Sequence, residues 1–187
     1  MKLIPVSFTK IKRSTWRLVI FGIIIAVIAI ADQTTKSFIA HHFRLGEVLV
    51  VIPHLFNITY IVNQGAAFGM MAANTSWWRD MLLLWVPIAV CLWLLVLLWQ
   101  ARHQPRVLGI SYSLILGGAI GNLIDRINSG LVVDFIQVHW QEHYFPAFNV
   151  ADSAISIAAA LIIWQIIFAP AWNKKGAPTD LEKNNRR

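Results

Sequence analysis

Four long stretches of this chain contain no Asp, Glu, Lys or Arg. They cover Leu18–Ala31, Met81–Ala101, Val107–Ile124 and Ser153–Asn173. A helix that crosses a bilayer needs about 20 consecutive, mostly apolar residues, with a range of about 17–25. The last three stretches meet this length directly, whereas the first, with 14 residues, must carry the polar residues that follow it into the membrane. The sequence therefore predicts a mainly α-helical integral membrane protein with four transmembrane helices.

The composition excludes the main alternatives to a membrane protein. Of 187 residues, 57% are hydrophobic and only 13% are charged, against about 45–50% and about 25% in soluble domains. Too few polar side chains remain to cover a water-soluble body, and intrinsic disorder requires low hydrophobicity. The net charge of +7 lies in clusters beside the apolar stretches, without the interleaved aromatic residues of a nucleic-acid-binding face. We therefore expect no nucleic-acid partner.

Lys and Arg are distributed unevenly between the two sides that four crossings define. Twelve of the 16 lie on the side of the N-terminus, and seven of the nine Asp and Glu lie on the other side. Because basic residues concentrate in cytoplasmic segments, we expect both termini in the cytoplasm. Residues 173–187 contain Gly, Pro and charges of both signs, which is typical of a disordered end. Residues 1–172 are then the predicted membrane domain, and residues 173–187 a cytoplasmic tail.

The first apolar stretch has a second interpretation. Basic residues precede it, its apolar core is 14 residues long, and it ends in Ala29-x-Ala31. Together these features also describe a cleavable signal peptide. Topology does not distinguish the two interpretations, because cleavage leaves the other three spans in the same orientation.

The segment between the first two spans is predicted to contain β-structure. Glu47–Ile52 and Phe56–Val62 are rich in β-branched and aromatic residues, and Pro53-His54 separates them. This pattern is typical of a short hairpin or a small sheet. Apolar residues occupy both of its faces, so we expect it to lie on the bilayer surface or against the helix ends.

Small residues recur at every fourth position of the third span, at Gly109, Ser113, Gly117 and Gly121. Such a small-xxx-small stripe lets a second helix approach closely. We expect this face to pack against another span, and the packing alone explains the glycines.

Two aspartates at the outer ends of spans have basic neighbours. Asp32 and Lys36 are spaced i,i+4 with the acid first, the favourable order for an ion pair on a helix. Asp125 is adjacent to Arg126. Solvated or paired helix ends explain both acids without further function.

Asp134 and Asp152 are different. Asp134 lies within the apolar run Leu131–Ile136 and has no Lys or Arg within seven residues. Asp152 begins the fourth span, where a helix N-cap is the alternative role. Two carboxyl groups that meet in an apolar setting cannot both stay ionised, and aspartic proteases use such a pair as acid and base. A shared aspartate site is therefore one hypothesis, beside an N-cap role for Asp152.

Other polar residues bear on this hypothesis. Asn63, Asn122 and Asn149 all fall at the outer face, and three amides at one depth indicate a polar pocket. His139, Glu142 and His143 suggest zinc, but their order differs from H-E-x-x-H and their surroundings do not predict a helix. We therefore expect no metal site and no cofactor.

Five ordered blocks of the chain carry a family resemblance. They are Asp32-Gln-Thr-Thr-Lys36, Asn63-Gln-Gly-Ala-Ala-Phe68, Gly117-Gly-Ala-Ile-Gly-Asn-Leu-Ile-Asp-Arg126, Val132-Val-Asp-Phe-Ile136 and Phe145-Pro-Ala-Phe-Asn-Val-Ala-Asp-Ser153. In these blocks the chain resembles the lipoprotein signal peptidases, the type II signal peptidases of bacteria. Any one block is weak, but five in order over roughly residues 16–172 are specific.

The resemblance implies a four-span aspartic protease of the bacterial inner membrane, with an extracytoplasmic β-cradle and a small interfacial helix. It also implies that the first span is retained. The implied substrate is a prolipoprotein that carries diacylglycerol on a cysteine, cut just before that cysteine. The active site would face the periplasm, in contact with membrane lipid. Such acid–base chemistry requires no cofactor, and we expect a monomer.

The resemblance also assigns roles to residues. The catalytic pair would be Asp134 and Asp152. The substrate pocket would contain Asn63, Asn122, Arg126 and Asn149. Structural support would come from Asp32, Lys36 and Asp125. Two other functions remain as alternatives, a small proton-coupled transporter, whose carboxylates would lie near the bilayer midplane, and a non-catalytic membrane scaffold.

Overall fold

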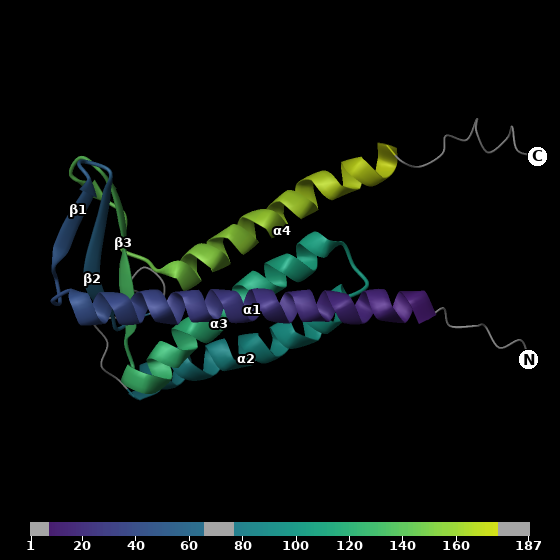
Figure 1. The fold of residues 1–187 in the computed structure, drawn as a ribbon, viewed down its shortest axis with the longest axis horizontal. Coiled ribbons are helices and arrows are strands. Elements are labelled where there is room, and N and C mark those ends of the chain that lie inside the picture. The colour runs from purple at the N-terminus through teal and green to yellow at the C-terminus, as the bar shows by residue number, and fades with distance from the viewer. Residues whose placement is uncertain (1–7, 66–76, 176–187) are drawn as a thin grey trace, which may run out of the picture.

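A computed structural model describes residues 8–65 and 77–175. Its helices are α1 (Phe8–His42), α2 (Trp77–Ala101), α3 (Arg106–Ser129) and α4 (Val150–Lys175). Each contains a segment long and apolar enough to cross a membrane, which confirms the predicted spans. The helices run alongside one another, with the start of α1 and the end of α4 at one end of the molecule and a small sheet at the other (Figure 1).

The stripe of small residues on α3 packs against α1, as predicted. A Cβ added at Gly109 would overlap the ring of Phe21, and one at Gly117 would lie 2.9 Å from Ile28 Cβ. A Cβ at Gly121 would lie 2.5 Å from Asp32 Oδ2. The two helices therefore approach so closely that only glycine fits. This contact places Asp32 of α1 directly opposite Gly121 of α3.

The sheet has four antiparallel strands in the order β1 (Val48–Ile52), β2 (Phe56–Asn63), β3 (Val132–Trp140) and β4 (His143–Tyr144). The predicted hairpin is confirmed as β1 and β2. The sequence alone does not predict β3, since its apolar run gives no clear periodicity. No separate interfacial helix occurs within residues 8–65 and 77–175.

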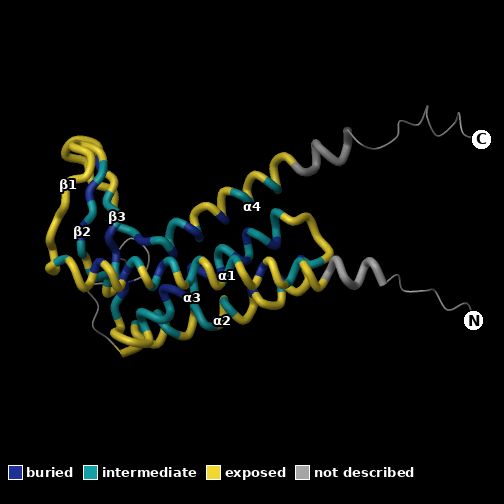
Figure 2. Tube along the Cα trace, viewed as in Figure 1, coloured by how far each residue is buried: buried dark blue, intermediate teal, exposed yellow. Residues whose placement is uncertain are grey.

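Burial in the described residues is concentrated where the helices meet one another and the base of the sheet (Figure 2). Phe21, Leu94, Leu98 and Leu116 form an apolar core between α1, α2 and α3. The outer faces of the helices are apolar yet exposed, with large side chains such as those of Trp85, Trp93 and Trp164. A continuous apolar exterior is the surface that a lipid environment requires.

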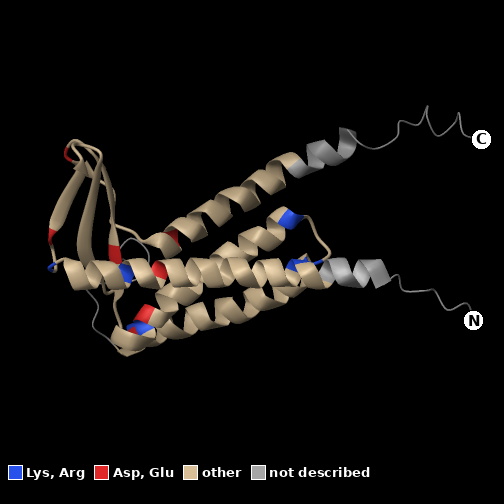
Figure 3. Ribbon diagram, viewed as in Figure 1, with Lys and Arg blue, Asp and Glu red and all other residues tan. Residues whose placement is uncertain are grey.

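Charged residues lie toward the two ends of the helices (Figure 3). At the end away from the sheet, Arg17 Nη1 donates hydrogen bonds to the backbone oxygens of Arg102 and Gln104. In the part of the chain that is described, all carboxylates lie at the end that carries the sheet. The helix α4 continues to Lys175, and the rest of the predicted tail lies outside the described residues.

Candidate active site

The start of α4 positions Asp152 through a reciprocal capping interaction. Asn149 Oδ1 accepts a hydrogen bond from the backbone N–H of Asp152 at 3.0 Å. Asp152 Oδ2 in turn accepts one from the backbone N–H of Asn149 at 3.4 Å. This is the arrangement of a capping box, in which the residue before the helix and its third residue satisfy each other's N–H groups. The N-cap is therefore Asn149, and the alternative role of Asp152 as N-cap is wrong.

Asp134 projects from β3 and is held by two amides. Its Oδ1 accepts a hydrogen bond from Asn149 Nδ2 at 2.8 Å, and its Oδ2 accepts one from Asn63 Nδ2 at 3.2 Å. The residue is only 4% exposed. Burial, together with the nearby charge of Asp152, raises the pKa of Asp134 from 3.8 to about 6, against the opposing effect of the two amides. This carboxyl group therefore keeps its proton to higher pH than an ordinary aspartate does.

Asn122 of α3 completes the polar network. Its Nδ2 donates a hydrogen bond to Asp152 Oδ1 at 2.9 Å, and its Oδ1 lies 3.3 Å from Asn149 Nδ2. The fully buried Asn149 side chain therefore contacts Asp134, Asn122 and the backbone of Asp152. The structure brings together two carboxyl groups and three amides from four separate segments of the sequence.

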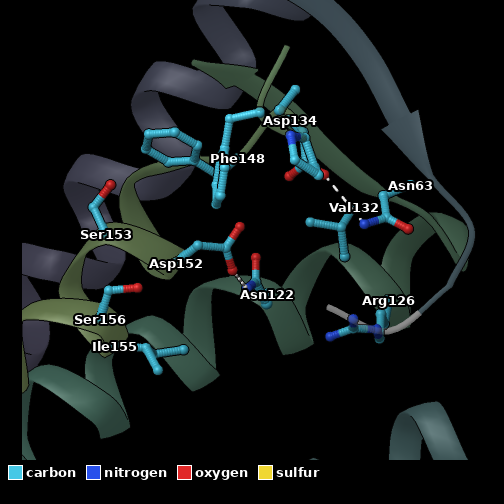
Figure 4. Close-up of a pocket in the computed structure, with 13 residues that line it drawn as sticks. Asn63, Asn122, Arg126, Val132, Asp134, Phe148, Asp152, Ser153, Ile155 and Ser156 are labelled. Carbon is cyan, nitrogen blue, oxygen red and sulfur yellow. Dashed lines mark hydrogen bonds between the residues drawn. The ribbon is translucent and has the colours of Figure 1, made fainter. Parts of the chain in front are cut away.

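Asn63, Asn122, Asp134 and Asp152 line a cavity of about 530 Å³ (Figure 4), whereas the fully buried Asn149 is not among its lining residues. Arg126 also lines it, and its Nη2 lies 3.4 Å from the backbone oxygen of Gly65. The remaining lining is mostly apolar, and it comprises Val132, Phe145, Pro146, Ala147, Phe148, Ser153, Ile155 and Ser156. Such a cavity offers an apolar surface for a ligand and a few convergent polar groups that could act on it.

Behind the cavity lies a buried cluster of charges. Lys36 Nζ lies 2.7 Å from Asp32 Oδ2, as the i,i+4 spacing predicts, and 2.9 Å from Asp125 Oδ2. The ion-pair partner of Asp125 is therefore Lys36 and not its neighbour Arg126. Asp32 is fully buried and its Oδ1 accepts a hydrogen bond from the backbone N–H of Ala151 at 2.9 Å. The cluster thus joins α1, α3 and the first turn of α4.

Gln33 belongs to this cluster, although no role for it is predicted from the sequence. Its Nε2 donates hydrogen bonds to Asp125 Oδ1 at 2.8 Å and to the backbone oxygen of Gly121 at 3.0 Å. In the sequence, only its place in the block Asp32–Lys36 points to a role for Gln33. Its partners on α3 become apparent only in the folded structure.

The histidines near β4 make other contacts. Among the residues that the structure describes, no three His, Cys, Asp or Glu side chains gather as metal ligands. His139 Nδ1 lies 2.9 Å from the backbone oxygen of Gln141, and its ring stacks on Tyr144 with centroids 4.7 Å apart. These contacts hold the turn between β3 and β4.

Known proteins are similar to this chain in sequence and in architecture. The family described as "Signal peptidase (SPase) II" matches residues 24–168. A lipoprotein signal peptidase of Yersinia enterocolitica is 40% identical over 149 residues, which cover 78% of this chain and 85% of the relative. One from Syntrophotalea carbinolica is 44% identical over 75% of this chain and 87% of its own length.

Structural similarity agrees with this. A bacterial membrane enzyme solved by the in meso method at 2.3 Å resolution superposes with a TM-score of 0.73 at 33% identity, covering 86% of this chain and 94% of that enzyme. A second bacterial membrane enzyme, solved by the same method at 1.9 Å resolution, superposes with a TM-score of 0.67 at 31% identity. The match covers 78% of this chain and 91% of that enzyme. By sequence and by fold, the chain belongs to the signal peptidase II family.

Proposed function

We propose that this protein cleaves diacylglyceryl-modified prolipoproteins just before the modified cysteine, with Asp134 and Asp152 as its catalytic pair. As a member of the signal peptidase II family the protein is a membrane protease that removes signal peptides from lipoproteins. The observation that carries the catalytic assignment is the side chain of Asn149, which contacts both aspartates at one cavity.

The two carboxyl groups would act as base and acid. The ionised member takes a proton from a bound water, and the oxygen of that water attacks the carbonyl carbon of the scissile peptide bond. The protonated member donates a hydrogen bond to the carbonyl oxygen as negative charge develops on it. A proton then reaches the leaving amine as the C–N bond breaks. Neither a covalent intermediate nor a metal ion enters these steps, so activity should survive EDTA and phenanthroline.

The other residues around the cavity would bind the substrate. Asn63, Asn122 and Arg126 line the cavity, and they would orient the peptide backbone near the scissile bond. Asn149 would belong to the pocket through its contacts with Asn122 and Asp134. The apolar wall would receive the side chains of the signal peptide. Asp32, Lys36 and Asp125 would support this wall from behind.

The placement of the cavity suits a lipid-anchored substrate. It lies where the helices meet the sheet, so acyl chains could stay in the outer leaflet while the peptide reaches the carboxyl groups. Lifting such chains into water costs about 0.8 kcal/mol per exposed CH₂ group. The excess of Lys and Arg that the sequence places on the side of the N-terminus supports cytoplasmic termini, a periplasm-facing site and a location in the bacterial inner membrane. We take the working unit to be a monomer without nucleic-acid partners.

Nothing favours the alternatives. A proton-coupled transporter would place its carboxylates near the bilayer midplane, whereas Asp134 lies in the sheet beyond the helix ends. A scaffold would not need two carboxyl groups, one of them buried, at one cavity.

The test is a cleavage assay with two forms of one prolipoprotein, with and without the diacylglyceryl group, and the purified protein in detergent. We expect the lipidated form to be cut before the modified cysteine and the unlipidated form to remain intact. Equal cleavage of both forms would contradict the substrate assignment.

A further inference from the structure

The ammonium group of Lys36 is buried and uses all its donors. Its side chain is 3% exposed, and an ammonium group offers three N–H donors and no acceptor. Two of its partners are the carboxylates of Asp32 and Asp125. The third is neutral, the side-chain Oδ1 of Asn122 at 2.8 Å. This third contact connects the charge cluster to the wall of the cavity.

The contact fixes which way the Asn122 amide points. Because Lys36 can only donate, the amide must turn its oxygen toward the ammonium group. Its NH₂ group then faces Asp152, and Nδ2 donates to Asp152 Oδ1 at 2.9 Å. A flipped amide would place NH₂ against the ammonium and oxygen against the carboxylate, so both contacts would become repulsive.

We propose, given the catalytic pair of the proposed function, that Lys36 is a positioning residue that acts through Asn122 to keep Asp152 ionised as the base. Both oxygens of Asp152 accept hydrogen bonds from N–H groups, one from Asn122 and one from the backbone of Asn149. Asp152 also lies in the first turn of α4, where the helix dipole favours negative charge. Its partner Asp134 then holds the proton.

The position of Asp134 agrees with this division of roles. It is 4% exposed and lies in a strand, whereas Asp152 lies in the first turn of α4. Desolvation, reinforced by the charge of Asp152, raises its pKa to about 6. Both carboxyl groups accept two hydrogen bonds from N–H donors, which favour the charged form. Asp134 is the more deeply buried of the two, and burial favours the neutral form.

Several charged groups surround the pair, and among them Asp152 raises and Lys36 lowers the pKa of Asp134. These groups are Asp32 and Lys36 of α1, Asp125 and Arg126 of α3, Asp134 of β3 and Asp152 of α4. Removal of Lys36 therefore also changes the field directly, through space. A double-mutant comparison with Asn122 separates that direct effect from the effect carried by the amide.

The experiment measures kcat/KM against pH for the wild type, Lys36→Met, Asn122→Ala and the double variant. The acid limb of this profile is the fall in kcat/KM toward low pH, and its position reports the protonation of the essential base in the free enzyme. We expect each single substitution to move the acid limb to higher pH by about one unit or more, and the double variant to move it no further than the larger single shift. Arg79→Met is the control, because it removes a cation that pairs with Asp80 outside the cavity wall. Its acid limb should stay in place.

Three results would overturn the proposal. In the first, the acid limb of Lys36→Met stays in place and its activity falls only as much as its thermal stability does. Lys36 would then have only a structural role. Single shifts that add in the double variant would show that Lys36 does not act through Asn122. If Lys36→Met does not fold, the variant Lys36→Met/Asp32→Asn replaces it, because it removes one positive and one negative charge and leaves the net charge of the cluster unchanged. An acid limb that stays in place in that variant would equally overturn the proposal. Full activity of Asp152→Asn in the same assay would instead contradict the proposed function.

Discussion

Asn149 Nδ2 donates a hydrogen bond to Asp134 Oδ1 at 2.8 Å, although the two residues lie on different elements, one before α4 and one in β3. The same side chain caps α4 through its Oδ1. One amide therefore fixes the separation between the strand that carries Asp134 and the helix that carries Asp152. Loss of this amide should affect activity more than stability.

The first prediction concerns this amide. Asn149→Ala should lower prolipoprotein cleavage at least about 10²-fold, because the carboxyl group of Asp134 loses a positioning contact and the backbone N–H of Asp152 loses its cap. The lost cap should cost only about 1 kcal/mol. Asn149→Ser restores the cap but not the bridge to Asp134, so it should recover thermal stability without recovering activity. Recovery of both by Asn149→Ser would show that the cap alone matters.

The second prediction tests the close contact between α1 and α3. Gly121→Ala should lower the melting temperature strongly and weaken cleavage, because its Cβ would meet Asp32 Oδ2 at 2.5 Å and displace the charge cluster. Gly22→Ala is the matched control, since a Cβ there meets nothing within 4 Å. That control should be neutral or stabilising by up to about 1 kcal/mol, as for Gly→Ala in a helix. Thermal melts in detergent measure both, and equal effects would contradict the packing argument.

The third prediction concerns pH and stability. The pKa of Asp134 is raised from 3.8 to about 6, so the folded state binds this proton more tightly than the unfolded state. The resulting stabilisation is complete below pH 3.8 and is lost as the pH rises through about 6, by up to about 3 kcal/mol. Asp134→Asn removes this dependence.

The measurement is the melting temperature of both proteins from about pH 4 to about pH 8, which spans the shifted pKa. Relative to the wild type, Asp134→Asn should gain stability as the pH rises. Asp80→Asn, which removes a carboxyl that is mostly exposed, controls for the loss of one acid. A constant difference between Asp134→Asn and the wild type across this range would contradict the raised pKa.

Local patterns in the sequence are enough to predict the spans, the β1–β2 hairpin, the Asp32–Lys36 pair and the glycine stripe. Each of these depends on residues a few positions apart, where hydropathy and helical spacing are informative. The stripe on α3 also indicates a close partner, although not that the partner is α1.

Contacts between distant segments could not be predicted in the same way. The strand β3 forms because β2 is available to pair with it, and Asn63 meets Asp134 across 71 positions of sequence. The pairing of Asp125 with Lys36 likewise depends on how α1 and α3 pack, while adjacency in sequence points to Arg126. Family resemblance places Asn149 in the pocket, but its capping of α4 emerges only with the fold.

The central claim is that Asp134 and Asp152 work as one catalytic unit. The most direct measurement is cleavage of lipidated prolipoprotein by Asp134→Asn, Asp152→Asn and the double variant, at matched concentration and with folding checked by thermal melt. Asn is nearly isosteric with Asp, so all three should fold. Each single variant should lose at least about 10²-fold in activity, and the double variant should be scarcely worse, as for groups that act on one water. Either single variant that kept more than about a tenth of wild-type activity would show that these aspartates are not the catalytic pair.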